Sequence, residues 1–91
     1  MRLEKADVRI SKKRSQREKK LKAAKKAVSF IVASARATKP DSKFDLIQQI
    51  WMFYFDLHNT GLLVASRMTR RRLKARFGTW AAVGVDPIYN V

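Results

Sequence analysis

The sequence predicts an all-α protein with a long basic N-terminal helix, a helical hairpin and an extended C-terminal arm. Apolar residues recur at intervals of three and four, which is the spacing of one face of a helix. Pro40, Gly61 and Gly78 divide the chain into segments that are each long enough for a helix. Hydrophobic residues make up 46% of the 91 residues, enough for one domain with one modest core.

The first helix is expected from about Ser11 to Thr38. Pro40 ends it, because the residue before a proline is pushed out of the helical region. Residues 1–10 fit either a helix or a short strand. An S-x-x-E capping box at Ser15 and Glu18 permits a later start.

One face of this helix is apolar from Leu21 onward, and the seam consists of Leu21, Ala24, Val28, Ile31 and Ala35. Upstream, Arg14 and Arg17 occupy the same line, and the helix is basic all round. We therefore expect it to pack against the rest of the protein only from Leu21.

The second helix is expected to begin after a cap at Asp41 or Ser42 and to end near His58. It carries two apolar stripes. The first, expected in the core, consists of Phe44, Ile47, Trp51 and Phe55. The second consists of Leu46, Ile50, Phe53 and Leu57. Together the two stripes cover an arc around the helix axis that is about twice the ~100° apolar arc of an ordinary surface helix. Because two neighbouring helices would hardly cover it, we infer a dimer or higher oligomer.

The third helix is expected over roughly Leu62 to Phe77, with Gly78 as its C-terminal stop. Residues 79–91 are predicted to form an apolar, mostly extended arm that docks onto a neighbouring subunit. The chain then divides into a basic segment (1–20), a helical core (21–78) and the arm (79–91). The residues expected at the oligomer interface are Leu46, Ile50, Phe53, Leu57, Trp80 and Tyr89.

The net charge of +14 is concentrated at the two ends of the sequence. Residues 1–38 carry a net charge of +10, residues 39–66 carry −1, and residues 67–91 carry +5. Between Lys12 and Arg36 the one acidic residue is Glu18. Like charges this close destabilise an isolated helix, and a polyanion would relieve the repulsion. Phosphate binding is therefore favoured over a simple solvated face.

The expected nucleic-acid contacts are Lys12, Lys13, Arg14, Arg17, Lys19, Lys20, Lys22, Lys26, Arg67, Arg70, Arg71 and Lys74. A helix of about 28 residues spans about 42 Å, roughly twelve base pairs, which favours a duplex. No Asn or Gln lies beside the basic residues to distinguish bases. A helix-turn-helix around Gly61 is disfavoured, because it would bury Arg67 and Arg70 without partners.

Catalytic chemistry is not expected, so the chain is predicted not to be an enzyme. There is no cysteine and one histidine, His58, so neither a nucleophile–base pair nor an ordinary zinc site can be assembled. Asp45 and Asp56 share a helix face about 16 Å apart, too far for a carboxylate pair. We expect no metal, no cofactor and no small-molecule substrate.

Residues 46–66 carry too many polar side chains to span a bilayer, and the N-terminus lacks a secretory signal, which favours an intracellular protein. The function expected is packaging or coating of nucleic acid through nonspecific phosphate contacts, as a nucleoprotein or capsid-like subunit that could belong to a virion. The alternatives are a small dimeric regulator that binds duplex RNA or DNA, a component of a larger ribonucleoprotein particle, and a basic membrane-surface protein. Membrane binding is less favoured, since residues 12–20 contain no Trp, Phe or Leu anchor.

Overall fold

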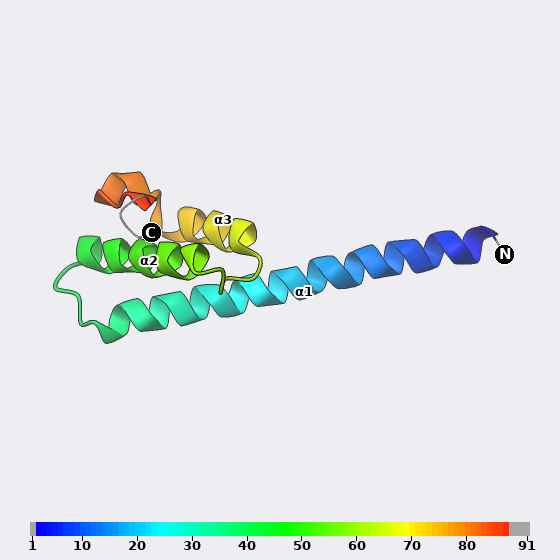
Figure 1. Cartoon of the computed structure of the whole chain (residues 1–91), viewed down its shortest axis with the longest axis horizontal. Coiled ribbons are helices and arrows are strands. Elements are labelled where there is room, and N and C mark those ends of the chain that lie inside the picture. The colour runs from blue at the N-terminus through cyan, green and yellow to red at the C-terminus, as the bar shows by residue number, and fades with distance from the viewer. Residues whose placement is uncertain (1, 88–91) are drawn as a thin grey trace.

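The computed structural model describes residues 2–87, with side chains from Arg14 to Pro87. In chain order the elements are α1 (Arg2–Ala37), α2 (Lys43–Asn59), α3 (Ser66–Phe77) and a short 3₁₀ helix, η1 (Trp80–Val83). There is no strand within residues 2–87, so the all-α prediction is confirmed. α2 runs back along the C-terminal half of α1, while the N-terminal half of α1 projects beyond the other helices (Figure 1).

α1 is longer than predicted, because it begins at Arg2 rather than near Ser11. The ambiguous N-terminal segment is therefore helical, and the capping box at Ser15 and Glu18 lies inside the helix instead of starting it. The C-terminal end agrees with the prediction within one residue. There the Thr38 hydroxyl donates to the Ala35 carbonyl over 2.6 Å.

α2 is capped as the sequence predicts, with Ser42 rather than Asp41 as the capping residue. The Ser42 hydroxyl oxygen accepts a hydrogen bond from the Asp45 amide over 3.2 Å, which satisfies one of the free N–H groups of the first turn. At the other end the Thr60 amide donates to the Asp56 carbonyl. The helix therefore ends one residue beyond His58.

α3 starts at Ser66, so the predicted start at Leu62 is wrong by about one turn. Residues 62–65 form a loop instead, and it enters the helix through Ala65, whose φ of 56° is in the left-handed region. The C-terminal stop is confirmed. Gly78 has a φ of 85°, and its amide donates to the Lys74 carbonyl over 2.9 Å.

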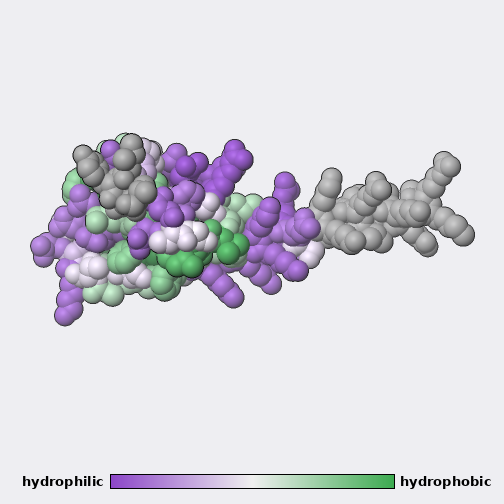
Figure 2. Space-filling view, in the orientation of Figure 1, coloured by the Kyte–Doolittle hydropathy of each residue, from purple (hydrophilic) through white to green (hydrophobic). Residues whose placement is uncertain are grey.

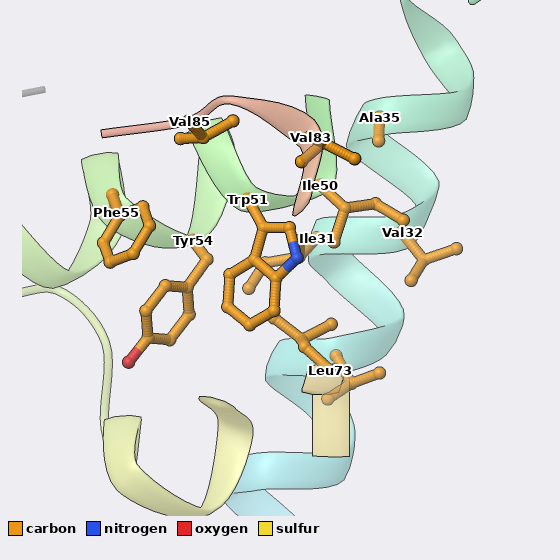
Figure 3. Close-up of a cluster of buried hydrophobic side chains, with 11 residues drawn as sticks. Ile31, Val32, Ala35, Ile50, Trp51, Tyr54, Phe55, Leu73, Val83 and Val85 are labelled. Carbon is orange, nitrogen blue, oxygen red and sulfur yellow. The ribbon is translucent and has the colours of Figure 1, made fainter. Parts of the chain in front are cut away.

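The core is centred on Trp51, which is fully buried among side chains from α1, α2, α3 and residues 83–85 (Figure 3). Its ring meets Tyr54 edge to face at a centroid distance of 5.5 Å. The predicted α1 seam is confirmed from Ala24 to Ala35, while Leu21 remains 38% exposed. Among the described residues, no acceptor lies within hydrogen-bond distance of the buried Trp51 Nε1–H group.

The C-terminal arm is not extended away from the molecule; that prediction is wrong for residues 79–87. This segment turns through η1 and packs on α2. The Trp80 ring meets Phe55 edge to face at 5.7 Å, and Gln48 donates to the Val83 carbonyl over 3.3 Å. Tyr89 lies outside the described residues.

The folded-back segment explains how a single chain covers most of α2. α1 and α3 cover part of the helix, and η1 supplies a third neighbour that the sequence did not reveal. Ile50 is fully buried inside the chain, so its assignment to an oligomer interface is wrong. Leu46, Phe53 and Leu57 are half-buried against the same core, and Trp80 packs on Phe55 of its own chain.

The molecule is elongated, with extents of 61 × 22 × 20 Å and a radius of gyration of 16.7 Å. A compact domain of this length would have a radius of gyration of about 12 Å. The difference comes from α1, whose N-terminal half has no neighbour among the described residues (Figure 1). The part of α1 before the core, residues 2–20, therefore extends from a small helical core, and we call it the basic rod.

Replacing Trp51 with alanine should lower the free energy of unfolding by about 3–5 kcal/mol, because it leaves a large cavity in the core. Urea denaturation followed by circular dichroism measures this. Met52→Ala is the matched control, since its side chain on the same helix is 41% exposed. It should cost less than about 1 kcal/mol. Equal losses at the two positions would contradict the assigned core.

Val83→Ala should destabilise the fold by about 1–2 kcal/mol, because the side chain is buried against α2. Because the contact lies within one chain, the loss in free energy of unfolding should not change when the protein concentration is raised about 100-fold. A loss that disappears on dilution would instead place this segment on a neighbouring subunit.

Candidate nucleic-acid interface

No described residue packs against the basic rod formed by the projecting part of α1. Every residue from Arg14 to Lys20 is exposed, and burial begins only at Ala24. Figure 2 shows hydrophilic side chains around this stretch. Lys22 and Lys26 continue the exposed charge alongside the core. The side chains of Lys12 and Lys13 lie outside the described residues.

Further along α1 the lysines separate onto two sides of the buried seam. Lys25 faces α3 and lines a hollow between the two helices. Lys26 lies on the opposite side and lines an apolar groove beside the loop after α2. Neighbouring lysines in the sequence therefore take part in different surfaces, as the 100° rotation per residue requires.

α3 carries two basic flanks separated by a buried line. That line consists of Thr69 and Leu73, both fully buried. Thr69 tolerates burial because its hydroxyl donates to the Ala65 carbonyl over 3.1 Å. Arg72 and Arg76 lie on the flank that faces α1. The residues predicted from the sequence lie on the other side of the line and are exposed: Arg67, Arg70, Arg71 and Lys74.

The hollow between α1 and α3 brings together cations that the sequence did not group. It encloses about 390 Å³ and is lined by Lys25, Val28, Ser29, Arg72, Ala75 and Arg76. The Arg76 guanidinium also lies 5.1 Å from the centroid of the Phe77 ring, which favours a fixed orientation. Recognition of Thr69 as a core residue would have placed Arg72 and Arg76 on one flank. Their approach to Lys25 requires the packing of the two helices.

The apolar groove lies on the other side of α1, where the loop after α2 passes the helix. It encloses about 360 Å³ and is lined by Ala23, Lys26, Ala27, Phe30, Leu57, Leu62, Leu63 and Val64. Phe30, Leu62 and Val64 are 60%, 72% and 68% exposed. Figure 2 shows hydrophobic atoms on this face near the end of α2.

Arg70 lies apart from the α1 lysines, near the hydroxyl of Tyr54 on the α2 side of α3. Burial raises the pKa of Tyr54 above its ordinary value of 10.0. The Arg70 charge and a hydrogen bond with the Ser66 side chain act in the opposite direction and only partly offset this rise in pKa. The hydroxyl donates to the Ser66 carbonyl over 3.1 Å, and the His58 ring stacks on Tyr54 at 5.8 Å. The hydrogen bond from Tyr54 to Ser66 links α2 to the start of α3.

The described part of the chain holds no group of three or more His, Cys, Asp or Glu side chains placed to bind a metal ion. None of its helices is both long enough and apolar enough to cross a bilayer. What the exposed side chains offer is a dense set of cationic hydrogen-bond donors on α1 and α3. Such donors bind anions, and phosphate above all when arginine forks are present.

Comparison of the chain with known protein families, with curated proteins and with solved structures gave no match.

Ionisation of Tyr54 should destabilise the fold in alkali. Because the folded-state pKa is raised, this contribution to stability is complete below pH 10 and is lost as the pH rises through the folded-state pKa. Urea midpoints measured from pH 8 to 11 should therefore fall more steeply for the wild type than for Tyr54→Phe. Both proteins share the titration of lysines, so parallel curves would contradict the raised pKa.

Proposed function

We propose that this chain binds nucleic acid nonspecifically through the phosphate backbone and coats it as a nucleoprotein subunit. The observation that carries the proposal is the basic rod formed by the projecting half of α1. The rod has no protein partner among the described residues, and its cations from Arg14 to Lys20 are all exposed. A polyanion along the rod would lower the repulsion between them.

An ordinary solvated helix face is a poorer account of this charge. Such faces alternate acidic and basic residues, which stabilise one another at spacings of three and four. Here Glu18 is the one acidic residue between Lys12 and Arg36. Release of counterions from nucleic acid supplies the free energy of binding, and it needs no particular base sequence. DNA and RNA are both compatible with contacts of this kind.

The length of α1 suits a duplex or a long single strand. Its 36 residues span about 54 Å. Because cations surround the rod rather than line one face, several neighbouring phosphates can be contacted without a fixed register. Such a geometry fits coating better than recognition of a defined site.

Contacts between copies are part of the coating proposal, but they need a surface other than the second α2 stripe, which is largely covered within one chain. The same basic surface on a discrete dimer would instead suit a regulator of duplex RNA or DNA. Light scattering of the protein bound to a long duplex separates the two: continuous growth with protein concentration favours coating, and a fixed small complex favours the regulator.

Binding to an anionic membrane surface is the second candidate, and one observation favours it. Phe30, Leu62 and Val64 are largely exposed beside Lys26, and apolar side chains next to lysines are typical of proteins that lie on lipid. A Leu62→Ser/Val64→Ser variant separates the candidates. If the chain binds nucleic acid, this variant should bind a duplex as tightly as the wild type does. The nucleic-acid proposal is wrong if the wild type does not bind a duplex and the variant loses the wild type's binding to anionic vesicles.

Affinity for a duplex oligonucleotide should fall steeply with salt. If about six phosphates are neutralised, log K should change with log salt with a slope near −5. Fluorescence anisotropy titrations between low and moderate salt measure the slope. Two duplexes of unrelated sequence should give the same affinity. A slope near zero, or a marked preference for one duplex, would overturn the proposal.

Arg14→Gln/Arg17→Gln should weaken duplex binding by about fivefold or more and leave the fold unchanged, since both side chains are exposed. The matched control is Lys39→Gln/Lys43→Gln, which removes two exposed charges at the turn between α1 and α2. It should change affinity by no more than about twofold. Equal effects of the two variants would show that net charge, rather than the rod, determines binding.

A further inference from the structure

Three basic residues from two helices line the hollow between α1 and α3. Lys25 comes from α1, and Arg72 and Arg76 come from α3. None of the side chains that line the hollow is acidic. Bringing like charges together raises the free energy of the unbound protein, and an anion placed between them reverses the sign of that interaction.

The core fixes the two helices that carry these cationic residues. α1 and α3 pack through fully buried side chains, with Ala24 and Ile31 on α1 and Leu73 on α3. The helices cannot move apart to relieve the repulsion without exposing this apolar surface. The backbone positions of Lys25, Arg72 and Arg76 around the hollow are therefore fixed before any ligand arrives, which lowers the entropic cost of binding.

The hollow also offers the kinds of donor that a phosphate group needs. Small apolar side chains, Val28 and Ala75, line it and leave it open to solvent. Ser29 contributes an exposed hydroxyl, and Arg76 is oriented by the Phe77 ring at 5.1 Å. Arginine forks bind phosphate oxygens in pairs, whereas lysine supplies a point charge.

We propose that this hollow is a phosphate-binding site that holds a phosphodiester group of the nucleic-acid backbone between α1 and α3. Arg72 and Arg76 act as forked donors, and Lys25 contributes charge from the facing helix. The inference rests on the proposed function and extends it, because it joins the two basic blocks of the sequence into one surface. From the hollow, the backbone continues along the line of Arg17 and Arg14 on the basic rod.

The test compares two arginine pairs on the same helix. Arg72→Gln/Arg76→Gln removes the forks from the hollow, and Arg67→Gln/Arg71→Gln removes two exposed arginines from the opposite flank. Affinity for a duplex, measured by anisotropy at fixed salt, should fall at least about tenfold for the hollow pair. It should fall about threefold or less for the flank pair. Equal losses would overturn the inference.

Two further variants keep the result interpretable if the half-buried Arg72 also affects folding. Lys25→Gln changes only an exposed side chain and should weaken duplex binding more than Lys22→Gln. Arg72→Lys/Arg76→Lys keeps the charge and removes the forks, so affinity should fall several-fold while the salt slope is preserved. If the Arg72→Lys/Arg76→Lys variant binds the duplex as tightly as the wild type, the arginine forks do not hold a phosphate group and the inference is wrong.

The failure of this inference and the failure of the proposed function give different results. A wild-type protein that does not bind the duplex would refute the proposed function and the inference with it. A wild-type protein that binds, with the hollow pair no weaker than the flank pair, would refute the inference alone. The same variants titrated with phosphatidylglycerol vesicles test the source of the phosphate: a loss confined to vesicles would overturn the assignment to nucleic acid.

Discussion

The packing of the α1 seam around Trp51 determines the rest of the structure. Residues from Ala24 to Ala35 are apolar along one line, and this line is covered by α2 and α3. Upstream the same line is occupied by Arg14 and Arg17, which cannot be buried without partners. The core therefore ends where the seam ends. Before it α1 projects beyond the other helices, and its side chains from Arg14 to Lys20 are exposed.

The same packing sets the chemistry of α3. Because Leu73 and the hydrogen-bonded Thr69 are buried against the neighbouring helices, one arginine flank faces α1 and the other faces away. Arg72 and Arg76 are brought to Lys25, while Arg70 lies near Tyr54. A shift of one residue in the buried line of α3 would rotate its flanks by about 100° and dismantle the hollow. The core thus decides which cations act together.

The sequence predicted the features that depend on local pattern. Helical periodicity identified the α1 seam and the buried Trp51, and the Ser42 cap and the Gly78 stop agree with the structure. It did not predict where residues 79–87 pack, because a short apolar segment carries no periodicity that identifies its partner. It also left Arg72 and Arg76 ungrouped. Periodicity assigns residues to faces of one helix, whereas their approach to Lys25 depends on how two helices pack.

In the proposed complex, the basic rod and the α1/α3 hollow form one surface for a nucleic-acid backbone. The most direct measurement is an NMR titration of the labelled protein with a duplex oligonucleotide. We predict that the largest chemical-shift changes lie in residues 14–29 and 72–76, with little change in residues 45–56. Changes concentrated in residues 62–64, or confined to α3 while residues 14–29 stay unperturbed, would contradict this account.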